Sequence, residues 1–445
     1  MPEGLVKVAC AKIAVLDFGL TPRFVAFRNH FLPAIPLDQT CERLSNWKDG
    51  IVGLARDLIA ISSPSGAEGA LARFLVEKMR ELQLADARID AAGNVVGLVR
   101  GQTPGPTMVL ATHLDTVDPG ERALWEHDPL AGDIADGFLH GLGAASNKAA
   151  LAAQVFAAAA FAPDLLPAGN LVVASVVAGE PSGSLGMQVL FERTLPELGI
   201  SPSAVVLGDP TGLSLFVGHR GRAEIEIVTF GRTSHASAPW LGLNAIHKMQ
   251  PVLGGIAELA TALPSHPFLD KSTIAVTGIE AAPGALDRVP DRCVVRVDRR
   301  YLPGESLDTV VSQLRTIVAR CAAQDPEFQA EVRVRSAEER TYTGLARSVP
   351  RVMSPWLLRD DHPLVSRALA ALASVNQEPG IDKWFFSTDG SFTAGGLGLP
   401  TIGYAPGRER YACTPYDRVL VDDILRAAIG TAAIIASLED APNVR

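Results

Sequence analysis

The sequence predicts an α/β protein in which a smaller unit of strands and helices interrupts a larger domain. Three observations predict this class: helices that alternate with short, fully apolar runs, a middle segment with alternating polar and apolar residues, and a return to the first pattern near the C-terminus. Fully apolar runs are typical of a parallel sheet covered on both faces. Strict alternation is typical of a strand with one exposed face. We therefore expect two sheets of different kinds.

Length and charge restrict the function. A chain of 445 residues is long enough for two or three domains, at roughly 100–200 residues each. The chain carries 40 Lys and Arg against 49 Asp and Glu, a net charge of −9, and no long basic run. Duplex DNA and anionic membranes are bound chiefly through Lys and Arg, so neither is expected as a partner. Chemistry on a small molecule is favoured.

Cysteine usage and the N-terminus indicate a cytoplasmic protein. The cysteines are scattered and lack CxxC spacing, which is typical of a reducing compartment; they are Cys10, Cys41, Cys293, Cys321 and Cys413. The most apolar stretch, residues 149–162, is too short to span a bilayer. Charged residues interrupt the N-terminal region where a signal peptide would need an apolar run. We interpret residues 1–40 as an N-terminal extension of unknown role.

The larger domain is expected at residues 41–213 and 339–445. Its first part contains four apolar runs that predict buried strands: Val95–Val99, Met108–Thr112, Leu171–Val177 and Ala204–Leu207. Between them, apolar residues with helical spacing predict helices at Trp47–Ile61, Ala67–Leu82 and Lys148–Phe161. A helix at His362–Val375 and a strand at Thr401–Tyr404 resume the pattern near the C-terminus.

The inserted unit is expected at residues 214–338. Alternation predicts strands at Arg222–Phe230, Ser272–Ile279, Cys293–Arg299 and Ala330–Arg335. Helices are predicted at Asn244–Ala262 and Ser306–Ala323. The resulting order, β-α-β-β-α-β, is that of a ferredoxin-like unit.

Polar residues follow three of the predicted buried strands. His113, Glu180 and Asp209 each stand just past the carboxyl end of such a strand. Ligands of open α/β sheets bind outside those ends, so the three side chains are expected in one site. Asp115, two residues after His113, would hold one imidazole nitrogen and leave the other for a metal or a proton.

Seven motifs occur in an order that resembles a known enzyme family. They are HLDTV, W–DP–G–HGLGAxSxK, GE–SGSLG, GDPTG–GHRGR, TSHASAP–GLNAI, VP–DRRYLPGE and GYAPG–ACTP–D–V. This order resembles the dinuclear zinc peptidase family of aminoacylase, acetylornithine deacetylase and succinyl-diaminopimelate desuccinylase, from about residue 45 to the C-terminus. The resemblance implies a zinc-exopeptidase-like catalytic domain, an inserted lid through which two chains dimerise, and hydrolysis of an amide next to a carboxylate.

The resemblance also implies roles for individual residues. His113 and Asp209 would be ligands of one metal ion, and Asp115 would orient His113. Glu180 would be the general base. His235 would reach across the dimer to the oxyanion.

Two further residues of the lid would bind the substrate. Asn244 and Arg300 would line its site, with Arg300 on the carboxylate, a task for which the guanidinium is suited through bidentate pairing. Structural roles remain open for two lid residues: Arg300 as a strand residue paired with a neighbouring acid, and His235 as a solvated loop histidine.

Three metal-ligand positions of the family are substituted. The bridging aspartate of GxGxxD is Ser146, and the second residue of an adjacent glutamate pair is Pro181. The last ligand, a histidine six residues after the glycine of the PG pair, is Cys413. Two zinc ions ~3.5 Å apart repel by about 19 kcal/mol at an effective dielectric of ~20, and the family offsets this with carboxylates that these residues lack. We expect at most one zinc or other divalent ion, held by His113 and Asp209, or none.

Three functional hypotheses follow. The first is hydrolysis of an N-acyl amino acid or short peptide, with Glu180 as base. The second is metal-independent chemistry in the same pocket, with Cys413 as a nucleophile beside His113, or with Glu180 and His113 as acid and base. The third is a non-catalytic protein that binds a carboxylate at Arg300. We adopt the first.

Two segments near the C-terminus complete the interpretation. We interpret residues 387–390 as a turn rather than as part of the pocket. Arg408 or Arg410, next to the PG pair, is placed to meet an acidic substrate.

Overall fold

The computed structural model describes residues 37–162, 165–181 and 183–437. The predicted N-terminal extension lies almost entirely outside the described residues; only the start of helix α1 falls within it, where Thr40 is buried. No helix in the described ranges has the length and apolar character needed to cross a bilayer.

The six predicted helices are present, and the first helix, α1, is one of four additional helices in the described residues. The helices run at α1 (Leu37–Asn46), α2 (Lys48–Ala60), α3 (Gly69–Glu81), α4 (Ala149–Ala159), α5 (Leu185–Val189), α6 (Leu195–Glu197), α7 (Ala245–Ala262), α8 (Leu307–Gln324), α9 (Pro363–Ser374) and α10 (Val421–Ala436). The helix α1, the short helices α5 and α6 and the long helix α10 were not predicted. One turn of π-helix, η2 (Ala144–Lys148), leads into α4.

The large sheet has nine strands; its central strands are parallel to one another, and β19 is parallel to its neighbour β8 at the edge. Its path is β1-β2-β6-β3-β7-β20-β8-β18, with β19 beside β8. The strands are β1 (Ala85–Ile89), β2 (Val95–Arg100), β3 (Thr103–His113), β6 (Ala168–Val176), β7 (Ala204–Leu207), β8 (Leu215–His219), β18 (Trp356–Leu357), β19 (Ile381–Trp384) and β20 (Thr401–Gly403). The strands β6, β3, β7 and β20 are parallel, whereas β1, β2, β8 and β18 pair antiparallel.

The predicted parallel sheet is therefore present in the centre, and the prediction is wrong at the edges. The tight turn between β1 and β2 supplies one reason, because the Asp90 carboxylate accepts the backbone N–H groups of Ala92, Gly93 and Asn94. A turn of this kind joins antiparallel strands and leaves no room for a crossover helix. The strand β8 lies just past the predicted domain boundary at residue 213 and still pairs in this sheet.

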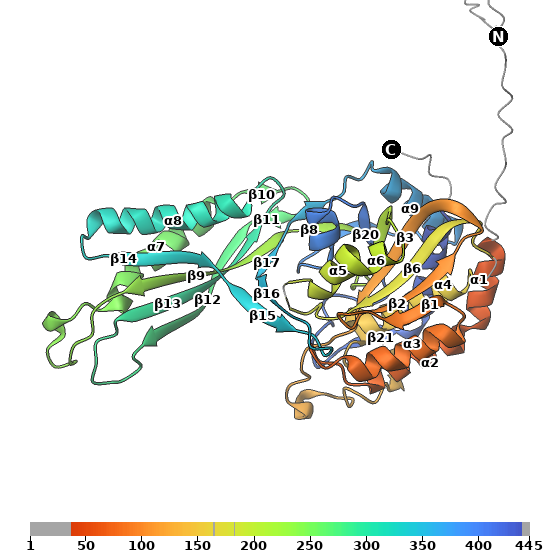
Figure 1. The fold of residues 1–445 in the computed structure, drawn as a ribbon, viewed down its shortest axis with the longest axis horizontal. Coiled ribbons are helices and arrows are strands. Elements are labelled where there is room, and N and C mark those ends of the chain that lie inside the picture. The colour runs from red at the N-terminus through yellow and green to blue at the C-terminus, as the bar shows by residue number, and fades with distance from the viewer. Residues whose placement is uncertain (1–36, 163–164, 182, 438–445) are drawn as a thin grey trace, which may run out of the picture. The chain divides into compact units, whose positions relative to one another are not determined.

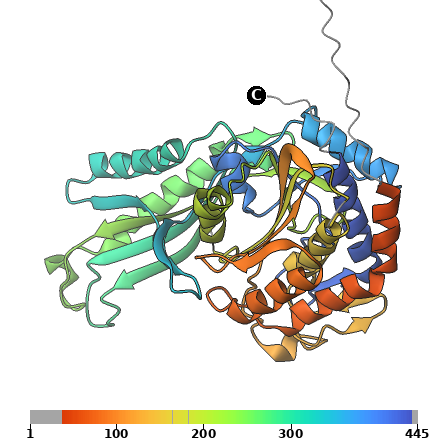
Figure 2. The same cartoon turned by 45° about the vertical axis from the view of Figure 1, so that its right-hand side comes forward.

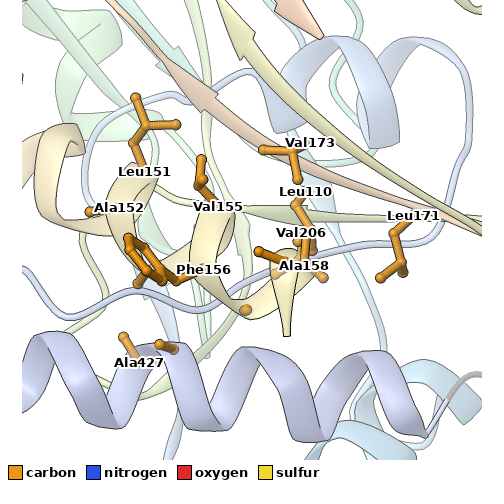
Figure 3. Packing of buried hydrophobic residues seen from close by; sticks show 14 of the residues in the cluster. Leu110, Leu151, Ala152, Val155, Phe156, Ala158, Leu171, Val173, Val206 and Ala427 are labelled. Carbon is orange, nitrogen blue, oxygen red and sulfur yellow. The ribbon is translucent and has the colours of Figure 1, made fainter. Parts of the chain in front are cut away.

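The alanine-rich helix α4 forms the centre of the main core. All eleven of its residues are buried. In Figure 3, Phe156 and its neighbours lie between Ala427 of α10 on one side and Leu110, Val173 and Val206 of the sheet on the other. Small side chains allow α4 to approach both layers closely, and a helix that is apolar on every side is stable only when covered all round.

The inserted unit consists of four strands and two helices, and its strands belong to a five-stranded antiparallel sheet, whose fifth strand is β17 (Val352–Met353). Its strands are β9 (Gly221–Phe230), β12 (Thr273–Ala282), β13 (Arg292–Tyr301) and β14 (Gln329–Val334), in the spatial order β12-β13-β9-β14. Figures 1 and 2 show α7 and α8 side by side on one face of this sheet. The chain order β9-α7-β12-β13-α8-β14 is the predicted β-α-β-β-α-β order.

Shorter strands connect these parts. They are β4 (Ile134–Ala135), β5 (Phe138–His140), β10 (Ser265–His266), β11 (Asp270–Lys271), β15 (Ser336–Arg340), β16 (Ala346–Pro350), β17 (Val352–Met353) and β21 (Arg418–Leu420). The strand β17 pairs with β9 of the inserted unit, and β21 pairs with β5.

Candidate active site

The carboxyl ends of three neighbouring strands meet at one cavity. His113 is the last residue of β3, Glu180 follows β6, and Asp209 follows β7. All three line a cavity of about 280 Å³, as the strand-end argument predicts.

The His113 imidazole is held by Asp115. Its Nδ1 lies 2.8 Å from the backbone oxygen of Asp115 and 3.3 Å from the Asp115 carboxylate. Nε2 lies 3.9 Å from Asp209 Oδ1, within the cavity. Burial lowers the pKa of His113, but the hydrogen bond and charge of Asp115, together with the charges of Glu180 and Asp209, raise it to about 10. Asp115 therefore does what the sequence predicts: it occupies one ring nitrogen and leaves the other facing the cavity.

The Asp115 carboxylate also fixes the segment that carries Glu180. It accepts the backbone N–H groups of Gly179 and Glu180 at 2.8 and 3.0 Å, and the Ser65 hydroxyl at 2.5 Å. Burial raises the pKa of Asp115, but these donors and His113 lower it further, so the carboxyl stays ionised. One buried carboxylate thus determines the positions of both His113 and Glu180.

Glu180 points its carboxylate into the cavity beside Cys413. Burial raises its pKa, an effect that His113 opposes and Asp115 strengthens. The Cys413 thiol donates to Glu180 Oε1 across 3.6 Å. A carboxylate with a raised pKa in a cavity is suited to general-base work near neutral pH.

The three substituted positions do not fit a two-zinc centre. The Ser146 hydroxyl donates to the Asn147 amide oxygen at 3.0 Å, and Pro181 has no side-chain donor atom. The Cys413 thiol is engaged with Glu180. Within the described residues, no group of three or more His, Cys, Asp or Glu side chains is placed to hold a metal ion. His113 and Asp209 are the pair that remains, one fewer than catalytic zinc normally has.

Cys413 does not have the surroundings of a nucleophile. Burial, followed by the charge of Glu180, raises the pKa of its thiol. Its hydrogen-bond partner is Glu180 rather than His113. Reactive cysteines are paired with cations that lower the thiol pKa, so these contacts do not favour the cysteine hypothesis.

Two acids that sequence reasoning did not assign also line the cavity. Burial raises the pKa of Asp389 to about 6 and that of Glu409 to about 7. Asp389 lies in the segment 387–390 that we interpreted as a turn, and Ser387 and Thr388 of that segment line the cavity as well. The interpretation of that segment as a turn outside the pocket is wrong.

Arg300 lines the cavity together with Arg222 of the neighbouring strand. The two residues face each other in the register of β13 and β9. Each places its Nε 2.7 Å from a different oxygen of Asp298. Arg300 therefore pairs with a neighbouring acid, as the structural alternative predicts. It also lines the cavity, as a substrate-binding role requires.

Neither His235 nor Asn244 lines this cavity within one chain. Asn244 caps α7, with its Oδ1 accepting the N–H of Ile246 at 2.9 Å. His235 is exposed, and its Nδ1 lies 2.7 Å from Ser237 Oγ. The role of His235 across a dimer stays a prediction.

Comparisons with known proteins agree with the fold and give the family. The model of Peptidase family M20/M25/M40 matches residues 109–437. The protein YgeY of Escherichia coli K12, described as uncharacterized, is 31% identical over 90% of this chain and 97% of its own length. Succinyl-diaminopimelate desuccinylase of Methylorubrum populi is 27% identical over 63% of this chain and 75% of its own. Among solved structures, the Bacillus subtilis YXEP protein, a dinuclear metal-binding peptidase, covers 89% of this chain with all of its own at a TM-score of 0.66 and 14% identity.

Proposed function

Because the chain belongs to peptidase family M20/M25/M40, whose members are amidohydrolases, we propose that it hydrolyses an amide bond of a small, carboxylate-bearing substrate. The substrate is an N-acyl amino acid or a short peptide. The enzyme works with at most one divalent metal ion per chain.

One observation carries this proposal. The Asp115 carboxylate binds the backbone N–H of Glu180 and lies against the His113 imidazole, so the general base and its neighbour are fixed by one buried group. This arrangement is kept although Ser146, Pro181 and Cys413 replace metal ligands. A protein that only bound a carboxylate would not need Glu180 positioned in the cavity.

The residues have the following roles. Glu180 removes a proton from the attacking water and returns it to the leaving amine. Arg300 binds the carboxylate of the substrate. His235 of a second protomer stabilises the oxyanion. A divalent ion bound by His113 and Asp209 would polarise water or the amide carbonyl.

Charge explains why a second ion is not part of the proposal. Two divalent ions need carboxylates between and beside them, and the hydroxyl of Ser146 and the ring of Pro181 carry no charge. The cavity still contains the carboxyl groups of Glu180 and Asp209, whose pKa values are raised mainly by burial. One cation near them would offset the energetic cost of burying their negative charges.

The test combines metal analysis with turnover. Protein purified without chelator is analysed for metals by mass spectrometry and assayed against a panel of N-acyl amino acids and dipeptides. We expect no more than one ion per chain, and a loss of kcat of roughly 10²–10⁴-fold in Glu180→Gln. Glu327→Gln is the matched control, because Glu327 is exposed and outside the cavity lining.

Two results would contradict the proposal. One is two tightly held metal ions per chain. The other is a Glu180→Gln variant, folded as judged by its thermal transition, that retains the activity of the wild type on every substrate that the wild type cleaves.

A further inference from the structure

A second cavity opens beside the candidate active site. It has a volume of about 660 Å³, and its walls include Phe216, Phe385, Phe386, Arg408, Glu409 and Arg410. We call it the aromatic groove. Phe386 and Glu409 line both the aromatic groove and the active-site cavity, so the two spaces adjoin at these side chains.

The boundary between the two cavities is fixed by a hydrogen bond. Glu409 Oε1 accepts the backbone N–H of Phe385 at 2.9 Å. This bond joins the loop after β20 to the segment after β19, which also brings Asp389 to the active-site cavity. The boundary between the aromatic groove and the active-site cavity is therefore built from two segments that also line the active-site cavity.

The apolar wall of the groove is open to a ligand. Phe385 is 64% exposed, whereas Phe216, which also lines the groove, is buried. Aromatic side chains gain most from burial, and an exposed one in a concave site is typical of a surface that a ligand covers. An aliphatic or aromatic part of a substrate would pack against the exposed ring of Phe385.

The groove lining contains the two guanidinium groups of Arg408 and Arg410 and one carboxylate, that of Glu409. The stem of Arg408 lies over Gly212, where a Cβ would come within 3.2 Å of Arg408 Cγ and where φ is +59°. Arg410 stacks on the ring of Tyr411, 4.7 Å from its centroid. Neither arginine belongs to a carboxylate ion pair in the described part of the chain, and Asp423, near Arg408, pairs with Arg426.

We propose that the aromatic groove binds the acyl part of the substrate, and that this acyl part is an apolar chain with an anionic end. The inference rests on the proposed function. The carboxylate of the amino-acid part is bound by Arg300 on the inserted unit and the amide lies at Glu180. The acyl part then extends along Phe385 and Phe386, and its terminal anion is bound by Arg408 and Arg410.

Binding of two matched probes tests the groove without turnover. The probes are N-suberoylglycine, which ends in a carboxylate, and N-octanoylglycine, which has the same chain length and no terminal charge. They are titrated calorimetrically into full-length Glu180→Gln protein. We expect the suberoyl compound to bind about 10-fold more tightly, as one charge-assisted contact would give.

Variants separate the two parts of the groove. Arg408→Gln, or Arg410→Gln if the first variant does not fold, should reduce the preference for the suberoyl compound to near one. Phe385→Ala should weaken both probes to a similar extent. Arg359→Gln is the matched control, because that side chain is 82% exposed and lines neither cavity.

The outcomes distinguish this inference from the proposed function. Equal affinities for the two probes, or a preference that survives both arginine variants, would overturn the groove proposal even in an active hydrolase. An arginine-dependent preference in a protein that cleaves none of the tested amides would support the groove and overturn the proposed function.

Discussion

Single residues in the cavity show how the site is held together where metal ligands are missing. Ser146 donates to the Asn147 amide oxygen, and the Asn147 amide nitrogen donates to the backbone oxygens of His113 and Asp115 at 2.9 Å. The position that the resemblance assigns to a metal-bridging aspartate is thus part of a neutral hydrogen-bond network in this chain. This network fixes the segment of His113 and requires no cation.

The buried carboxyl of Asp389 predicts a pH-dependent stability. Its pKa is raised by burial from 3.8 to about 6, so its contribution to stability is fully present below pH 4 and is lost as the pH rises through 6. The free energy of unfolding should fall by about 3 kcal/mol over this range. Asp389→Asn cannot ionise, and its free energy of unfolding should fall less between pH 4 and pH 7.

Urea unfolding at several pH values measures this difference. Asp57→Asn, at an exposed position of α2, is the control and should keep the pH slope of the wild type. An Asp389→Asn variant with the same slope as the wild type would show that Asp389 is not the responsible group.

Restoring the three ligand positions should restore a second metal ion. The variant with Ser146→Asp, Pro181→Glu and Cys413→His has the carboxylates and the imidazole that two divalent ions need. We expect its zinc content, measured by mass spectrometry after dialysis, to rise to about two ions per chain. Ser146→Asp alone should not produce this change. A triple variant that is folded and holds no more zinc than the wild type would contradict the explanation by ligand loss.

At the scale of elements, the loop after β20 depends on one close backbone contact. A Cβ placed on Gly407 would collide with the backbone oxygen of Ala145 in η2. This loop carries both Glu409 and Cys413 into the cavity. Its path is therefore set by the absence of a side chain at residue 407.

Gly407→Ala should destabilise the protein and displace this loop. We expect a loss of about 1–3 kcal/mol in the free energy of unfolding, as for other overpacked positions, measured by urea denaturation. Gly254→Ala in α7 is the control, because nothing lies within 4 Å of the added Cβ. There the change should be neutral or stabilising by up to about 1 kcal/mol. Equal effects of the two substitutions would refute the role of the contact.

The elements also show what the sequence reveals and what it does not. His113, Glu180 and Asp209 were predicted as one site because each follows a fully apolar strand of the parallel centre. Asp389 follows β19, whose sequence IDKW has two adjacent charged residues between two apolar ones, so neither an apolar run nor an alternation indicated a strand there. The helix α10 begins without a side-chain cap, and the only start signal in its first turn is the acidic pair Asp422 and Asp423.

At the scale of the whole molecule, exposed apolar residues surround the loop of His235. Trp240 and Leu241 are 76% and 65% exposed, and Leu286 is fully exposed. The two loops that carry them are joined by a hydrogen bond from the Ala236 N–H to the Asp287 backbone oxygen. Such a surface favours an interface with a second chain, which supports the proposal of a homodimer completed by His235.

Mixed dimers test whether His235 acts on the cavity of its partner. Glu180→Gln and His235→Ala should each be inactive alone. After unfolding and refolding of an equal mixture, half of the dimers would be mixed with one complete site each, so about a quarter of the wild-type activity should return. Light scattering measures the dimer fraction. A mixture as inactive as its components, with dimers present, would place the action of His235 within its own chain or exclude it.

The aspartate shared by two arginines determines what kind of anion the cavity accepts. Asp298 already holds Arg222 and Arg300 in place, so the rotamer entropy of both long side chains is lost during folding and not during association with a ligand. Asp298 and Glu224 together offset two of the three positive charges of Arg222, Arg300 and Arg335, which leaves one. The pair is therefore matched to a monoanion such as a single carboxylate, and a phosphate dianion would remain only half neutralised.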